Sequence, residues 1–173
     1  MHIIHLAQVP RLEFGEINGE RSARIEALLE ACQAAGVAAA AVADITRALW
    51  RKISALAPIA SMTALTRAPI GALRAEPRAR GLLQALVEEA VAVGAAHGAG
   101  LAPGDAALIM AAIDGLSEGM RASMAFDIEN GKPLESPYLS GAIVRFGERL
   151  GVPTPTHKFF SDALAVWEKG ATR

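Results

Sequence analysis

Residues 123–137 read SMAFDIENGKPLESP and predict a sharp turn from one helix into the next. Asn130-Gly131 ends the first helix, because glycine readily adopts the left-handed conformation that follows a helix C-terminus. Ser136-Pro137 begins the second helix, since serine is a good N-cap and proline at the first helical position loses no hydrogen bond. The stretch therefore predicts a corner between two helices of a mainly helical fold.

The same corner carries polar side chains that helix packing does not need. Ser123 and Asp127 lie four residues apart and share one face of the first helix. Glu135 comes immediately before the second helix, whose dipole favours a carboxylate at that end. A serine and a carboxylate on either side of a tight corner indicate a candidate site. Ordinary helical proteins use the same punctuation at exposed corners, so a purely structural role is the alternative.

The composition is that of one soluble domain. The chain has 173 residues, enough for a sizeable core. Its net charge of −1 gives no electrostatic reason to expect nucleic acid or an anionic membrane as a partner. A lone Cys32 excludes an internal disulfide and fits a reducing compartment. The chain lacks a long apolar window and a signal-like start, so we expect a cytoplasmic protein without a transmembrane helix.

From Asp44 onward the apolar periodicity is helical nearly everywhere. Asp44 or Thr46 caps a long helix with a kink at Pro58, where proline removes a backbone hydrogen bond. Pro69-Ile-Gly71 and Glu76-Pro77 predict loops. Further helical segments are predicted over residues 78–97, from Pro103 to about Glu129, from Pro137 to Leu150 and from Lys158 to Lys169.

Residues 1–43 predict a β-β-α-β arrangement. Two extended runs flank Pro10 within residues 1–20, and a helix capped by Ser22 runs to about Ala35, where Gly36 ends it. A short buried strand over residues 37–42 follows. These strands are too few to close a sheet of their own.

The motifs along the whole chain resemble those of the ketopantoate reductase (2-dehydropantoate 2-reductase) family. They are Asp44-Ile-x-x-x-Leu-Trp50-x-Lys52, the Ser123…Asp127…Glu135 corner, Gly141, and Gly151-Val-Pro-Thr-Pro155. The resemblance implies a mainly α fold: a helical ketopantoate-reductase C-terminal-like (6-phosphogluconate-dehydrogenase C-terminal-like) domain over residues 44–173. It also implies that residues 1–43 are a small ββαβ remnant of a Rossmann nucleotide-binding domain.

The resemblance implies NADPH-dependent reduction of a 2-keto acid to a 2-hydroxy acid, a step of pantothenate biosynthesis. Lys52 matches the family's catalytic lysine, whose ammonium stabilises the developing alkoxide and can supply its proton. Glu135 matches the glutamate that holds the substrate hydroxyl and keeps the lysine oriented, and Ser123 matches a substrate-binding serine. The alternative for Lys52 is a solvated lysine on an exposed helix face.

The sequence departs from the family pattern at positions that would contact substrate. The family carries asparagines four and eight residues after its lysine, whereas this chain has Leu56 and Ala60 on that helix face. A polar substrate group buried there loses partners worth about 1–3 kcal/mol each. Ser140 and His157 also stand where the family has asparagine. A more apolar 2-keto acid and a loss of activity both fit these changes.

The nucleotide-binding fingerprint of the family is missing. No Gly-x-Gly-x-x-Gly follows a predicted strand, so we expect the implied cofactor, NADP, not to be held by this chain in the family's way. A truncated gene, a fragment and a second chain that supplies the missing half are the open explanations. His2 and His5 lie three apart, but no third ligand completes a metal site.

Two functional hypotheses follow. In the first, the chain is the substrate-side catalytic half of a 2-keto-acid reductase. In the second, it is an inactive helical self-association module left by loss of the cofactor domain. Both predict a homodimer, because bare strand edges within residues 1–20 are templates for pairing with another chain, and twofold closure is the commonest outcome.

Overall fold

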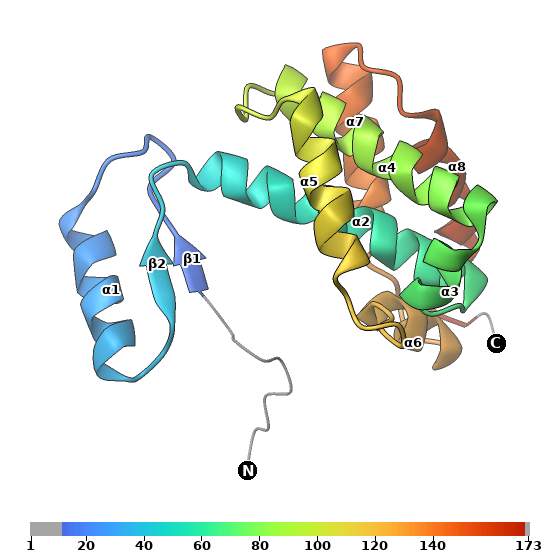
Figure 1. Cartoon of the computed structure of the whole chain (residues 1–173), viewed down its shortest axis with the longest axis horizontal. Coiled ribbons are helices and arrows are strands. Elements are labelled where there is room, and N and C mark those ends of the chain that lie inside the picture. The colour runs from blue at the N-terminus through green and yellow to red at the C-terminus, as the bar shows by residue number, and fades with distance from the viewer. Residues whose placement is uncertain (1–11, 172–173) are drawn as a thin grey trace. The chain divides into compact units, whose positions relative to one another are not determined.

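The computed structural model describes residues 12–171 (Figure 1). Within that range the chain divides into two compact units, the first ending at Leu49 and the second beginning at Trp50. Most of these residues are helical, and the strands among them form one two-stranded parallel sheet. The prediction of a mainly α fold is therefore confirmed. No helix among residues 12–171 combines the length and apolar character needed to cross a membrane.

The first unit is a small β-α-β arrangement of β1 (Leu12–Phe14), α1 (Ala23–Ala34) and β2 (Ala39–Ala41). The strands pair in parallel, with Leu12 opposite Ala39. Ser22 caps α1, as predicted, because its hydroxyl accepts a hydrogen bond from the Ile25 N–H (3.3 Å). Gly36 follows the helix with φ +68°, which is also as predicted. The first of the two predicted extended runs, with His2 and His5, lies outside the described residues.

The helices of the second unit are joined by short connections. α2 begins in the last residues of the first unit and continues into the second. In order, the helices are α2 (Ile45–Thr66), α3 (Ile70–Ala75), α4 (Pro77–Ala96), α5 (Pro103–Asp114), α6 (Ser123–Glu129), α7 (Ser140–Leu150) and α8 (Pro155–Leu164); two 3₁₀ turns are η1 (Ser136–Tyr138) and η2 (Ala165–Trp167).

The core of the second unit is built on α4 and on the later part of α2. Leu83, Leu86, Val87 and Ala90 recur at helical spacing and are fully buried on one face of α4. Burying a leucine of this kind contributes about 1.5–3 kcal/mol. In α2 the residues from Ala57 to Ala64 are all buried. α3, α5, α7 and α8 all pack against α4.

Trp50 fixes the start of the second unit. Its side chain is 8% exposed and its ring lies 5.1 Å from His97 and 5.3 Å from Phe146, centroid to centroid. Gly94 makes room for this cluster, because a Cβ there would lie 3.0 Å from the Trp50 ring and 2.8 Å from Leu101. The helix segment that carries Lys52 is thus anchored two residues upstream.

Two of the helix predictions differ from the structure. The predicted loops at Pro69-Ile-Gly71 and Glu76-Pro77 flank a short helix, α3, because proline is well tolerated at or just before the first turn. The long helix predicted through Pro58 is present as α2, and Pro58 is buried inside it. The segment predicted as helical from Pro103 to Glu129 is divided into α5 and α6 by residues 115–122, which include Gly115 and Gly119.

The boundaries of the last two helices also differ from those predicted. Ser136 is not an N-cap: it lies buried inside η1, its hydroxyl has no hydrogen-bond partner among the described residues, and α7 begins at Ser140. The Tyr138 and Leu139 N–H groups instead bond to the Glu135 carbonyl oxygen (2.8 and 3.2 Å). The final predicted helix, Lys158–Lys169, begins earlier, at Pro155, and ends in a 3₁₀ turn.

Candidate functional site

The predicted lysine lies on one face of α2 that runs from solvent into the core. Lys52, Leu56, Ile59 and Thr63 follow the spacing i, i+4, i+7 and i+11 and share this face. Lys52 is exposed and Leu56 is 37% exposed, whereas Ile59 and Thr63 are buried. We call these four residues the α2 face. A rise of 1.5 Å per residue separates Lys52 from Thr63 by about 16 Å along the helix.

Ala60 has a different environment from Leu56, although the sequence groups them. It is 1% exposed and belongs to the buried core of the second unit. Leu56 remains accessible beside Lys52. Of the two apolar positions, only Leu56 offers surface to a ligand in this structure.

The start of α6, which carries Ser123, is fastened to the buried end of the α2 face. The Thr63 hydroxyl accepts a hydrogen bond from the Ala122 N–H (3.3 Å) and donates one to the Ile59 carbonyl oxygen (2.8 Å). Ala122 immediately precedes Ser123, whose side chain is exposed. The structure therefore places Ser123 at the opposite end of the α2 face from Lys52.

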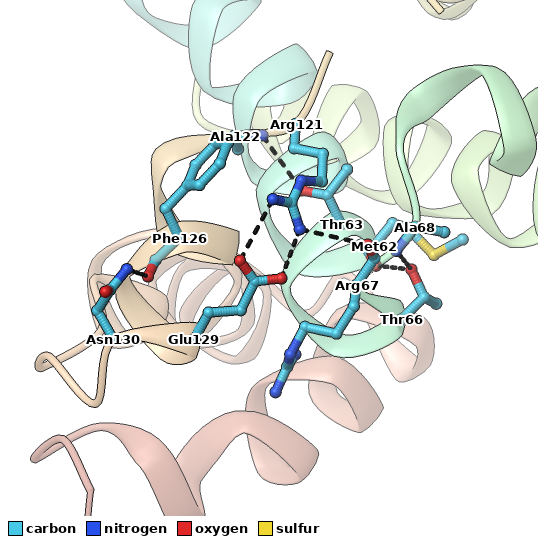
Figure 2. A network of polar contacts seen from close by, with 10 residues as sticks. All are labelled: Met62, Thr63, Thr66, Arg67, Ala68, Arg121, Ala122, Phe126, Glu129 and Asn130. Carbon is cyan, nitrogen blue, oxygen red and sulfur yellow. Dashed lines mark hydrogen bonds and ion pairs between the residues drawn. The ribbon is translucent and has the colours of Figure 1, made fainter. Parts of the chain in front are cut away.

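Arg121 forms a second link between α2 and α6 (Figure 2). Its guanidinium binds both carboxylate oxygens of Glu129 (2.5 and 3.2 Å) and lies 4.3 Å from the Phe126 ring centroid. It also donates to the Arg67 carbonyl oxygen at 3.4 Å. Figure 2 shows the Arg67 side chain directed away from this ion pair. These connections hold α6 in one position, and no pattern in the sequence predicts them.

The predicted corner between α6 and η1 is present. Asn130 follows α6 and Gly131 has φ +63°, the left-handed conformation that the sequence predicts. Asp127 faces Lys132 across the corner, with a carboxylate-to-ammonium distance of 3.8 Å, and its carbonyl oxygen accepts from the Lys132 N–H (2.9 Å). Glu135 follows, exposed to solvent.

The last described residues of the chain bind the same corner. We call residues 168–171 the C-terminal clasp. The Leu134 N–H donates to the Glu168 carbonyl oxygen (3.2 Å), and the Ala171 N–H donates to the Gly131 carbonyl oxygen (3.0 Å). A Cβ at Gly170 would lie only 2.6 Å from that Gly131 oxygen, so the close approach requires glycine. The clasp thus supports the backbone directly before Glu135.

The two remaining departures from the family pattern, Ser140 and His157, contact each other in the core. The Leu86 carbonyl oxygen can only accept, so His157 Nε2 donates to it (2.9 Å) and Nδ1 accepts from the Ser140 hydroxyl (2.9 Å). Ser140 in turn lies 2.7 Å from the Ser61 hydroxyl. We call Ser61, Ser140 and His157 the buried polar chain; all three are fully buried.

The buried polar chain joins three helices and is closed to substrate. Ser61 lies nine residues after Lys52, half a turn around α2, so the chain is on the opposite side of the helix from Lys52. Burial lowers the pKa of His157 to about 4, although its hydrogen bond to Leu86 and the Glu89 carboxylate oppose this. That carboxylate caps α8 by accepting from the Thr156 and His157 N–H groups (2.8 and 2.9 Å). The buried polar chain therefore has a structural role.

Lys52, Ser123 and Glu135 form no direct polar contact with one another within the described residues. All three side chains are exposed. Lys52 and Ser123 lie toward opposite ends of the α2 face, and the corner ties Glu135 to the helix that begins with Ser123. The arrangement is an open face with a cation at one end and hydroxyl and carboxylate groups on α6 and its corner.

The N-terminus of α1, in the first unit, does not fit a pyrophosphate. In dinucleotide-binding folds a phosphate lies at the helix N-terminus after a strand. Here the Glu16 carboxylate lies near the start of α1, where it binds the Ser22 hydroxyl (2.5 Å) and pairs with Arg24. These hydrogen bonds, with that of Arg24 foremost, lower the pKa of Glu16 to about 2. An anion already belongs to the protein there, and the glycine fingerprint is absent from the sequence.

No group of three or more metal-ligating side chains is present in residues 12–171.

Comparison with known proteins identifies the family. The family model described as "Ketopantoate reductase PanE/ApbA C terminal" matches residues 44–168, which include Lys52, Ser123 and Glu135. The chain belongs to the ketopantoate reductase family. The match covers the helical C-terminal part of these enzymes, in agreement with the resemblance seen in the sequence.

Two relatives cover nearly the whole chain. An uncharacterized oxidoreductase, YkpB of Bacillus subtilis, is 31% identical over 169 residues, which are 96% of this chain and 55% of that protein. A 2-dehydropantoate 2-reductase of Mesorhizobium japonicum is 32% identical over 154 residues, which are 89% of this chain and 47% of the relative. The chain therefore spans about half the length of these relatives.

The fold is also that of a solved ketopantoate reductase. The dimeric enzyme from Staphylococcus aureus superimposes with a TM-score of 0.83 and 24% identity, covering 91% of this chain and 53% of that one. At this identity the likeness concerns the fold.

Proposed function

We propose that this chain is the substrate-side half of an NADP-dependent 2-keto-acid reductase of the ketopantoate reductase type. The observation that carries the proposal is the α2 face: Lys52 lies exposed at one end, and Thr63 at the other holds the start of the helix that carries Ser123. Membership of the family supports the roles given to these residues. NADP supplies hydride in such a reaction, and the first unit does not fit it, so another part of the assembly has to bind it.

The roles follow from the charges that the reaction creates. Negative charge develops on the keto oxygen, and the Lys52 ammonium stabilises it and donates the proton. Ser123 donates a hydrogen bond to the substrate, and Glu135 accepts one from a substrate hydroxyl. The side chains are solvent-exposed in this chain, so closure by substrate and by a cofactor domain must exclude water.

Leu56 favours a keto acid with an apolar side chain. It is accessible one helical turn from Lys52, and Ala60 deeper in the helix supplies no polar group. A substrate with a hydroxyl at that position would lose a hydrogen bond to water without gaining one from the protein. We therefore propose a 2-keto acid with a branched or aromatic side chain, and a homodimer as the working form.

A chimeric enzyme tests the proposal. The N-terminal half of the Mesorhizobium japonicum relative is joined to this chain, and consumption of NADPH is measured with a panel of 2-keto acids. Lys52→Ala should lower kcat/KM about 100-fold or more, and Glu135→Gln about tenfold. Arg51→Ala is the matched control, because Arg51 is exposed next to Lys52 on α2 but lies off the α2 face; it should leave kcat/KM unchanged.

The inactive self-association module is the competing function, favoured by the apolar Leu56 position and by the missing fingerprint. A chimera that folds and binds NADPH, but reduces no keto acid, would support this alternative. Equal activity of the Lys52→Ala variant and the parent would reject the role of Lys52.

A further inference from the structure

A groove runs between α4 and α5, which pack against each other. The two helices are antiparallel: Arg80 near the start of α4 binds both carboxylate oxygens of Asp114 at the end of α5 (2.6 and 2.8 Å). The groove extends from this ion pair toward Pro103 and has a volume of about 570 Å³. Val91 and Met110 form part of its lining, and five alanines from the two helices contribute half of the rest.

The outer face of α5 has the composition of a buried helix. Its two acidic residues are both engaged: Asp105 is 4% exposed and accepts from the Ala102 N–H (2.8 Å), and Asp114 binds Arg80. The helix contains no lysine, arginine or glutamate. A helix that is apolar all round is normally covered on every side. Between its first residue, Pro103, and its last, Asp114, which are both exposed, its exposed positions are nevertheless Gly104, Ala107, Leu108, Ala111 and Ala112.

Other surface helices of the same unit differ in this respect. α7 exposes Arg145, Glu148 and Arg149, as expected for a helix with one face packed against the protein and the other in contact with solvent. Leu108, in contrast, is 60% exposed in the middle of the uncharged face of α5. Exposed apolar surface that is contiguous with a groove marks an interaction site.

We propose that this surface joins two copies of the chain, with α5 crossing the partner's α5 and Leu108 of each copy entering the α4–α5 groove of the other. Leu108 and the groove lie side by side on the α4–α5 hairpin. A twofold axis near the middle of α5 therefore brings Leu108 of each copy to the groove of the other. Leu108 is the sixth of the twelve residues of α5. The alanines that line the groove allow two helix backbones to approach closely.

The charges of the surface suit an antiparallel pair. With the axis near Leu108, the N-terminal end of each α5, where the helix dipole is positive, lies near the partner's Asp114 carboxylate. A stable dimer buries about 800 Å² on each partner, which is more than one helix face supplies. Arg80, Gln84 and Glu88 on the rim of the groove provide the additional polar contacts.

This inference rests on the proposed self-association and is independent of the proposed chemistry. It also differs from pairing through the strand edges of residues 1–20, which the sequence suggests, and the two surfaces can be distinguished by mutation.

Sedimentation of the whole chain tests the surface. Leu108→Asp places two charges near the axis and should raise the dimer dissociation constant at least tenfold. Val166→Asp is the matched control: Val166 is 67% exposed on η2, outside the groove, and the variant should sediment as the parent. Because both positions are exposed, both variants should melt close to the parent temperature by circular dichroism.

A crosslink provides a second measurement. In a Cys32→Ala background, Leu108→Cys should form a disulfide-linked dimer on mild oxidation, since equivalent residues meet near a twofold axis, and Val166→Cys should not. A monomeric parent chain at every concentration would overturn both the self-association and the surface. A dimer that is unchanged by Leu108→Asp and does not crosslink through residue 108 would overturn only the surface and leave the strand edges as the interface.

Discussion

His157 shows how a single buried side chain ties its helix to the core. Its imidazole donates to Leu86 on α4 and accepts from Ser140 on α7, so a second ring proton would require the Ser140 hydroxyl to turn from donor to acceptor. Burial already disfavours the charged form, and the pKa falls from 6.5 to about 4. Protonation therefore competes directly with the docking of α7 and α8.

We predict that His157 makes the free energy of unfolding fall as the pH falls from about 6.5 to about 4. In this interval the unfolded chain binds a proton at residue 157 and the folded chain does not, so acid favours unfolding. The contribution is fully present above the unfolded pKa and amounts to about 3 kcal/mol over the whole interval. Urea unfolding at several pH values should show a smaller loss for His157→Asn, and parallel curves for the two proteins would contradict the prediction.

At the scale of elements, one buried hydroxyl contributes to the docking of α6 on α2. We predict that Thr63→Val lowers the free energy of unfolding by about 1–3 kcal/mol, because the buried Ala122 N–H loses its acceptor while the side-chain volume is kept. Thr63→Ser keeps the hydroxyl and serves as the control, with a smaller loss. Denaturant unfolding measures both changes, and equal stability of Thr63→Val and the parent would show that the bond contributes nothing.

Local signals in the sequence predicted the elements that they control. Ser22, Gly36 and Gly131 act within one turn of their own position, and each predicted boundary is present. The prediction of Ser136 as an N-cap was wrong, because burial overrides the preference of serine for capping. α3 escaped detection because its flanking prolines and glycine, taken alone, are typical of loops.

The candidate site was predictable only in part, because its supports come from distant segments. Ser61 and Ser140 are 79 residues apart, and Thr63 and Ala122 are 59 apart. A single sequence carries no periodicity that connects such positions. The family resemblance supplied Lys52, Ser123 and Glu135 as candidates, but neither the burial of Ala60 nor the link from Thr63 to α6 follows from the motifs.

For the whole molecule, we predict that the chain alone binds NADPH weakly or not at all. The N-terminal region of α1 already holds the Glu16 carboxylate, and the sequence has no glycine-lined phosphate site. Isothermal titration of the purified chain should give no saturable heat. Micromolar binding that Lys52→Ala or Arg80→Ala abolishes would show that the helical unit itself carries a nucleotide site, contrary to this prediction.

The C-terminal clasp makes the position of Glu135 sensitive to what happens at the far end of the chain. The family match ends at residue 168, so a shortened protein could keep every motif residue and still lose most of the clasp. A carboxypeptidase that trims past Gly170 would remove the backbone donor to Gly131 and the close contact beside it. A bulky affinity tag fused at the same end would act in the same way. The result of an activity assay on this protein therefore depends on whether the C-terminal clasp is intact.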